Sequence, residues 1–169
     1  MMRHNPKQTL TMAMALAVLC AFGGANGPAR ADGSAPGFVT DTLTGVALDG
    51  MDPVSYFTNA QPLPGSPDFE YDWSGVPWYF ANAADRDIFI RSPEVYAPQF
   101  GGHSATSLAQ GYLSDGDPRI YAVVAQRLYL FYSAGNYDAF EKAPAATIDA
   151  ARKRWAALGT QLSASAASH

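Results

Sequence analysis

The clearest pattern of hydrophobic and polar residues runs from position 69 to position 80. Phe69, Tyr71 and Trp73 alternate with acidic residues, which is the period of a half-buried β-strand. Ser74-Gly75 then provide a turn, and the run Val76–Phe80 returns as the partner strand. The pattern therefore predicts an antiparallel hairpin with an aromatic face.

A second hairpin is predicted further along the chain. The runs Ile120–Val124 and Leu128–Tyr132 are rich in β-branched and aromatic residues, and only three residues separate them. Between Gln61 and Pro67 three prolines exclude regular structure. No internal repeat is visible in the sequence.

Helical signals fall between and after the hairpins. Asn82 is a predicted N-cap for a helix over 83–91, which must stop before Pro93. A short helix is predicted over 104–112, and a C-terminal helix from Tyr137 to about Leu162 is interrupted at Pro144. The expected fold is α+β: a small single domain with two antiparallel β-hairpins, interleaved short helices and a C-terminal helix. The expected core anchors are Trp73, Trp78, Phe80 and Phe89.

The N-terminus has the features of a secretory signal peptide. A positive start is followed by the apolar run 10–24 and by Ala29-Arg30-Ala31, a sequence that signal peptidases cleave. The alternatives are a retained membrane anchor or a buried helix. We expect cleavage after Ala31 and export to the periplasm, leaving a flexible leader (32–44), a domain (45–160) and a disordered tail (161–169).

Composition narrows the function of the mature chain. The chain has 169 residues and a formal net charge of −4, and removal of residues 1–31 leaves 8 basic and 15 acidic residues. The resulting charge of about −7 disfavours nucleic acid, because phosphate binding depends on Lys and Arg. Cys20, the only cysteine, leaves with the signal peptide, so the mature chain has no thiolate ligand or disulfide. Met51 is its only methionine.

The stretch 69–96 resembles the YHS domain family. Its matching residues are Gly75, Tyr79-Phe80, Phe89, Pro93-Glu94 and Tyr96. The flanks Gly50–Phe57 and Tyr96–Gly102 are similar to a longer, exported subgroup of that family, and the likeness covers roughly 45–135. The resemblance implies a small domain of a family in which many members are thought to bind metals through cysteines.

This chain departs from the family at the cysteine positions. Ser55, Ala81, Asp85 and Ser104 stand where relatives offer thiolates. Because soft metals need thiolate or thioether ligands, we expect no tight Cu(I) or Zn(II) site and no cofactor. His103 is the one weak candidate metal ligand, with water completing the shell of a hard or borderline ion.

Five residues are candidates for ligand binding: Asp52, Ser55, Tyr56, His103 and Ser104. His103 could act as a lone ligand or as a base near neutral pH, or could be a structural histidine beside the double glycine. Asp52 could supply an acid/base carboxylate, or could form the turn before Pro53. The hairpin aromatics could line a groove or face the core, and Arg152-Lys153-Arg154 is interpreted as one solvated helix face.

Two classes of function follow. The first is an exported, non-enzymatic binding or accessory module that binds a small ligand or a periplasmic protein partner. The second is a weak metal-binding protein using His103, or a small enzyme with His103 and either Asp52 or a tyrosine as acid and base. No catalytic residue is assigned, because no nucleophile motif, phosphate loop or paired catalytic carboxylates are present.

Overall fold

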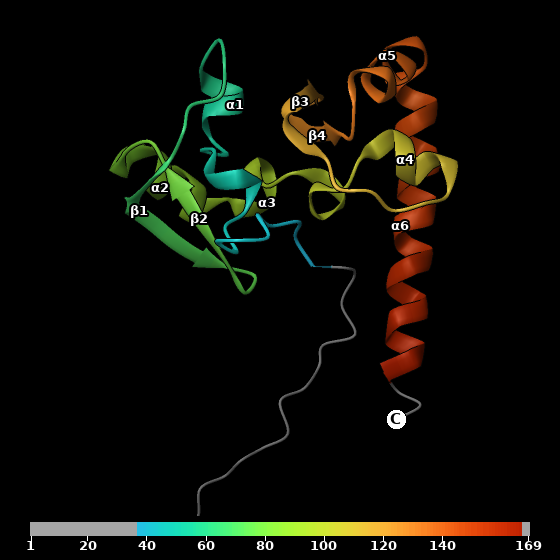
Figure 1. Ribbon diagram of the computed structural model, residues 1–169, viewed down its shortest axis with the longest axis horizontal. Helices are drawn as coiled ribbons and strands as arrows, with labels where there is room; N and C mark the ends of the chain where they lie inside the picture. Colours follow the sequence, from blue (N-terminus) through green and yellow to red (C-terminus); the bar gives the residue numbers. More distant parts are fainter. Residues whose placement is uncertain (1–36, 167–169) are drawn as a thin grey trace, which may run out of the picture. The chain divides into compact units, whose positions relative to one another are not determined.

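The computed structural model describes residues 37–166, with side chains up to Thr160, and these residues belong to one compact unit. The predicted signal peptide, residues 1–31, and the end of the predicted tail lie outside the described residues. The fold is α+β, as the sequence predicts, with two separate two-stranded antiparallel sheets (Figure 1). In chain order the elements are η1 (Leu48–Gly50), α1 (Ser55–Thr58), β1 (Ser66–Trp73), β2 (Val76–Phe80), α2 (Ala83–Arg91), α3 (Pro93–Tyr96), η2 (Gln99–Gly102), α4 (Ala105–Gln110), β3 (Asp117–Val124), β4 (Arg127–Phe131), α5 (Ala134–Lys142) and α6 (Pro144–Ala166).

Both predicted hairpins are confirmed. Trp73 pairs with Val76 at the turn of the first, and Val124 pairs with Arg127 at the turn of the second. Strand β1 begins at Ser66 and so includes Pro67, which the sequence places in an irregular segment. The pairing register shifts between Ser66 and Glu70, so the missing proline N–H falls where the ladder is already interrupted.

The helices also follow their sequence signals. The side chain of Asn82 accepts a hydrogen bond from the backbone N–H of Asp85 at 3.0 Å, so the predicted N-cap of α2 is confirmed. Pro144 divides the predicted C-terminal helix into α5 and α6, because a proline ring cannot continue a preceding helix.

The described residues contain an internal structural repeat, which the sequence does not reveal. A shift of 51 residues carries β1, β2 and α2 onto β3, β4 and α5, each with the length of its counterpart. The registers agree as well, since Ser66 pairs with Phe80 and Asp117 with Phe131. The pairs that are identical under this shift are Gly65/Gly116, Pro67/Pro118, Phe80/Phe131, Ala83/Ala134, Asp87/Asp138, Phe89/Phe140 and Pro93/Pro144.

The segments before the hairpins correspond too, with a shift of 52 residues. Leu48, Asp49 and Gly50 have φ angles of 55°, 50° and 77°, and the residues at 100–102 repeat this left-handed run with 58°, 62° and 86°. A short helix follows in each case, α1 or α4. We call residues 47–97 the first repeat and residues 99–148 the second repeat.

Each repeat contributes most of one hydrophobic core. The first core contains Trp78, Phe80 and Phe89, which are fully buried as predicted, and Trp73 packs at its edge half-buried. Leu128 and Leu130 of the second repeat also belong to this core, so the two repeats are packed together. The second core contains Phe100, Leu108, Tyr129, Phe131, Phe140, Ile148 and Ala151.

Ordered structure extends beyond the predicted domain, residues 45–160, at both ends. The leader, expected to be flexible through residue 44, is already held at Phe38, whose ring lies 5.3 Å from Trp73 and 5.0 Å from Trp78 between centroids. At the other end α6 continues to Ala166, past the predicted start of the tail at 161. None of the helices in residues 37–166 has the length and hydropathy that a membrane span requires.

Candidate functional site

Asp52 is the most deeply buried carboxyl group in the described part of the chain, with an exposed fraction of 0%. Its two oxygens accept backbone N–H groups from Val54 at 2.8 Å and Ala81 at 2.9 Å. The first bond starts the turn that leads into α1, and the second attaches that turn to the end of β2. Asp52 therefore has the hydrogen bonds of a turn former and helix cap.

Burial raises the pKa of Asp52 to about 6, although the N–H groups of Ala81 and Val54 oppose the shift. The neighbouring Asp85 carboxyl raises the pKa of Asp52 further. The Ser55 hydroxyl donates to the Asp52 carbonyl at 2.6 Å. We call the buried residues Asp52 and Ser55 and the half-buried residues Ala81 and Asp85 the Asp52 cluster.

The Asp52 cluster contains three of the four positions at which the resemblance described above predicts cysteines. Here Ser55, Ala81 and Asp85 provide a hydroxyl, a methyl group and a carboxylate. Ser55 is already committed, because its hydroxyl also accepts the backbone N–H of Leu63 at 2.8 Å. Within residues 37–160, no group of three or more His, Cys, Asp or Glu side chains could hold a metal ion.

Tyr56 holds the two repeats together. Its hydroxyl donates to the carbonyl of Pro118 at 2.8 Å, and its ring meets that of Tyr121 edge-on, 4.8 Å between centroids. Burial raises the pKa of this hydroxyl well above its usual value, so the group stays protonated. With 5% of its surface exposed, Tyr56 has little access to a ligand.

His103 and Ser104 lie in the second repeat, separate from the Asp52 cluster. The His103 ring lies 5.9 Å from that of Trp155, and its Nδ1 is 3.4 Å from an Asp115 carboxylate oxygen without a hydrogen bond. Burial lowers the pKa of His103, with Asp115 opposing the shift. Ser104 is fully buried and accepts hydrogen bonds from the backbone N–H and the hydroxyl of Ser107, at 3.5 and 3.1 Å, as an N-cap of α4.

The five candidate residues are thus divided between two buried places, one at the start of each repeat. They hold turns, caps and the contact between the repeats, and none of them lines the cavities described below. Within the described residues Nδ1 of His103 has no hydrogen-bond partner, although an Asp115 carboxylate oxygen lies 3.4 Å away.

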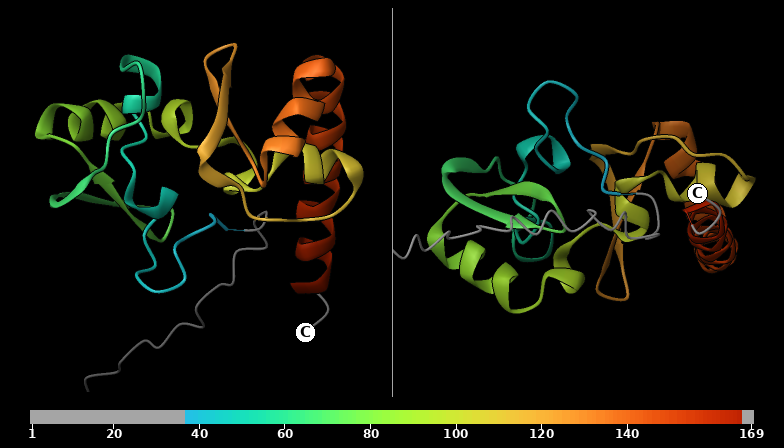
Figure 2. Two further views of the ribbon diagram at one scale, coloured as in Figure 1. Left: turned by 45° about the horizontal axis from the view of Figure 1, so that its top comes forward. Right: turned by 90° about the horizontal axis from the view of Figure 1, so that it is seen from below.

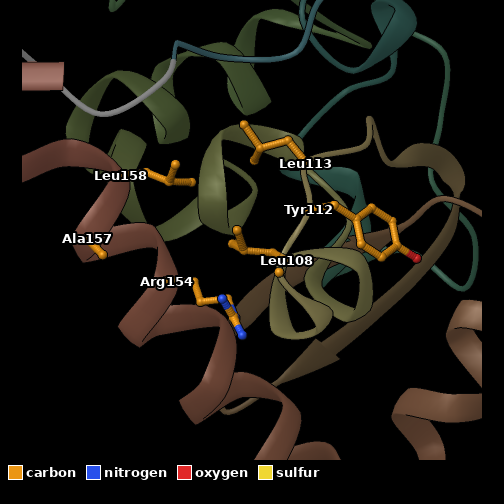
Figure 3. Close-up of a pocket in the computed structure, with 7 residues that line it drawn as sticks. Leu108, Tyr112, Leu113, Arg154, Ala157 and Leu158 are labelled. Carbon is orange, nitrogen blue, oxygen red and sulfur yellow. The ribbon is translucent and has the colours of Figure 1, made fainter. Parts of the chain in front are cut away.

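An open cavity of about 420 Å³ lies between α4, the loop that follows it and α6 (Figure 3). The two helices lie side by side in both views of Figure 2. Apolar residues make up most of the lining of this cavity, and the side chain of Arg154 of α6 reaches into it (Figure 3). We call it the α4–α6 cavity, and its lining residues are Leu108, Gly111, Tyr112, Leu113, Arg154, Ala157 and Leu158.

The position of Arg154 is set by the end of α4. Its Nε donates to the carbonyl of Ala109 at 3.3 Å, one of the acceptors that a helix C-terminus leaves unpaired. The guanidinium lies against Gly111, where an added Cβ would be 3.1 Å from its Cζ. Gly111 also has a φ of 104°, so both the turn and the close approach require glycine. Among the described residues, no carboxylate forms an ion pair with Arg154.

Sequence reasoning did not identify this cavity. Arg154 was interpreted as part of a solvated helix face, and its side chain is indeed exposed, but it borders a concave apolar surface. The available signal was Tyr112-Leu113, two large apolar residues directly after a glycine in a polar loop. They are 52% and 43% exposed.

Two further cavities lie within the described part of the chain. One of about 340 Å³ has aromatic walls, including Trp73 of the first hairpin and Trp155 of α6. The other, of about 380 Å³, is bordered by Asp41, Asp49, Asp115 and Asp117 together with Arg119. Glu94 and Arg152 border the aromatic cavity. The arginines of these two cavities each lie near a carboxylate, Arg152 at 3.9 Å from Asp149 and Arg119 at 3.7 Å from Asp117, whereas no ion pair of Arg154 is found within the described residues.

Comparison of this chain with protein-family models, curated proteins and solved structures found no match.

Proposed function

We propose that this chain is an exported, non-enzymatic binding module on a YHS-type scaffold, and that the α4–α6 cavity is its binding site. The observation that carries the proposal is the combination of apolar lining side chains with the guanidinium of Arg154, which forms no ion pair within the described residues, in an open cavity of about 420 Å³. Ligand sites are commonly concave and mostly apolar, with a few polar groups that orient the ligand. An apolar molecule with a negatively charged group fits this combination.

The buried polar side chains support a binding role over an enzymatic one. Asp52, Ser55 and Ser104 are fully buried, and their polar atoms are used in caps and turns. A catalytic acid or base must reach the substrate, which these groups cannot do without unfolding their turns. Within the described residues His103 forms an ion pair with Asp115 alone and belongs to no group of three potential metal ligands, so it gives less support to an acid/base enzyme or a metal site than the cavity gives to binding.

A fluorescence titration with anilinonaphthalene sulfonate tests the binding site, because this dye is both apolar and anionic. We expect saturable binding of one dye per protein, abolished by Ala157→Trp, which fills the cavity. Ala146→Trp is the matched control, since Ala146 is also an exposed alanine of α6 but lines no described cavity. Equal binding by both variants would contradict the proposal.

Export has its own test, independent of the cavity. The mass of the protein recovered from the periplasmic fraction of a bacterium that expresses the full chain should correspond to a start at Asp32. An intact Met1, or a lipid on Cys20, would contradict the proposed signal peptide.

A further inference from the structure

The internal repeat provides a comparison for the surface at which the α4–α6 cavity lies. Asp52 and Ser104 occupy corresponding positions in the two repeats. Three residues further along the chain, Ser55 of α1 corresponds to Ser107 of α4. Ser55 binds the loop before β1 through Leu63, and Ser107 binds the loop before β3 through Ser114 at 2.7 Å. By this correspondence Tyr56 of α1 matches Leu108 of α4.

In the first repeat, the surface at Tyr56 is covered by an extended segment. The covering residues are Pro118, whose carbonyl accepts the Tyr56 hydroxyl, and Tyr121, whose ring packs against that of Tyr56. Both belong to β3 of the second repeat. A strand carrying an aromatic side chain is therefore the element that completes this surface.

In the second repeat, the helix that packs along α4 is α6. Leu108 is 1% exposed and belongs to one core cluster with Ile148 and Ala151 of α6. The coverage is incomplete, because the α4–α6 cavity remains beside Leu108 and Tyr112 and Leu113 stay exposed. The cavity thus lies beside Leu108, the residue that corresponds to Tyr56 of the first repeat, and Tyr56 is covered by an extended segment.

We propose that the α4–α6 cavity receives an extended peptide segment of a protein partner, with an aromatic side chain placed beside Leu108 and a carboxylate on Arg154. This inference rests on the proposed binding function and names the occupant of the same cavity. The carboxylate follows from charge complementarity, since a guanidinium binds carboxylates through two parallel N–H groups and Arg154 has no ion pair within the described residues. The aromatic side chain follows from the covering of Tyr56 by Tyr121.

The chain itself supplies a suitable probe. Strand β1 is the counterpart of β3 in the first repeat, and its sequence, SPDFEYDW, contains three aromatic residues and three acidic residues. A labelled synthetic peptide of this sequence is the test ligand, and fluorescence anisotropy with the mature protein measures its affinity. The control peptide, SPNFQYNW, replaces each carboxylate by the isosteric amide.

We expect the acidic peptide to bind at least tenfold more tightly than its amide counterpart. Arg154→Gln should weaken binding of the acidic peptide at least tenfold, whereas Arg152→Gln on the same helix should change it less than twofold. Ala157→Trp should abolish binding and Ala146→Trp should leave it unchanged. Equal affinity for the two peptides, or binding that survives Ala157→Trp, would overturn the inference.

Two other occupants have distinct outcomes in the same experiments. If the sulfonate dye binds in an Ala157-dependent manner but the acidic peptide does not, the site takes small molecules and the inference fails while the proposed function stands. If neither binds, the proposed function fails as well. If sedimentation shows a dimer of the mature protein that Ala157→Trp dissociates, the occupant is a second copy of the chain, which also overturns the inference.

Discussion

Asp52 and Ser104 occupy the same position in the two repeats. The backbone N–H of Asp52 donates to the Leu63 carbonyl at 2.9 Å, and the backbone N–H of Ser104 donates to the Ser114 carbonyl at 2.8 Å. The residue that makes this contact has a titratable carboxyl group in the first repeat and a neutral hydroxyl group in the second repeat. Only the first repeat acquires a pH dependence from this position.

Asp52→Asn should flatten the pH dependence of stability in mildly acidic solution. The pKa of Asp52 is about 6 in the folded protein against 3.8 for an unperturbed side chain, so the folded state binds a proton that the unfolded chain releases. The free energy of unfolding should fall as pH rises from about 4 to about 6, by roughly 2–3 kcal/mol. Urea unfolding at several pH values measures this fall.

Asp85→Asn is the matched control for this prediction. Removing the neighbouring carboxyl should lower the pKa of Asp52, and the fall in stability should move to lower pH. A stability profile of Asp52→Asn that runs parallel to that of the unmodified protein would show that Asp52 does not cause the dependence.

His103 should titrate below the usual range of histidine. Burial lowers its pKa, so the folded state holds the neutral ring, and stability should be lost as pH falls below about 6.5, where the unfolded chain takes up a proton. An NMR titration of the ring protons measures the pKa directly. Asp115→Asn should lower the pKa further, because this carboxylate favours the protonated ring, and a pKa above 6.5 would contradict the prediction.

Phe89→Ala and Phe140→Ala should destabilise the protein by similar amounts. These residues correspond in the two repeats and are 0% and 1% exposed, and removing a buried phenylalanine costs about 3–5 kcal/mol. Each variant should still unfold in one transition, because Leu128 and Leu130 of the second repeat belong to the core of the first.

Calorimetry and urea unfolding of the two phenylalanine variants test both statements. Ile90→Ala on α2 is the control, since this side chain is 42% exposed and should cost about 1 kcal/mol or less. Two separate transitions in either phenylalanine variant would mean that the repeats unfold independently.

Gly65→Ala and Gly116→Ala should each destabilise the protein by about 1–3 kcal/mol. A Cβ at Gly65 would lie 2.5 Å from the carbonyl carbon of Tyr79, and a Cβ at Gly116 would collide with the Cβ of Leu130. Gly37→Ala has no such neighbour within 4 Å and should leave the melting temperature unchanged. Melting temperatures of the three variants equal to that of the unmodified protein would show that the backbone has room at both positions.

Tyr56→Phe should cost about 1–3 kcal/mol, because it leaves the carbonyl of Pro118 without its hydrogen bond between the repeats. A double-mutant cycle between Tyr56→Leu and Tyr121→Leu, each of which removes one ring, should give a coupling energy of about 0.5–1.5 kcal/mol from the aromatic pair. A coupling energy near zero would mean that the two rings contribute independently to stability.

The sequence by itself determined the local elements of this protein. Alternating aromatics located the first hairpin, Asn82 marked the start of α2, and Pro144 divided the C-terminal helix, because each of these signals acts through the backbone of its own segment. The buried aromatics Trp78, Phe80 and Phe89 were predictable for the same reason. The role of Asp52 in a turn was one of two interpretations the sequence allowed.

The repeat and the cavity were decided only by the tertiary structure. The two repeats share few identical residues, since a hairpin followed by a helix demands a specific residue at few positions and any apolar side chain of suitable size fills the rest. Arg154 gains its position from the end of α4, which lies 45 residues earlier in the chain. Residues that are distant in sequence combine into a binding surface only after packing, so no local pattern could have shown that Leu108, Leu113 and Arg154 border the same cavity.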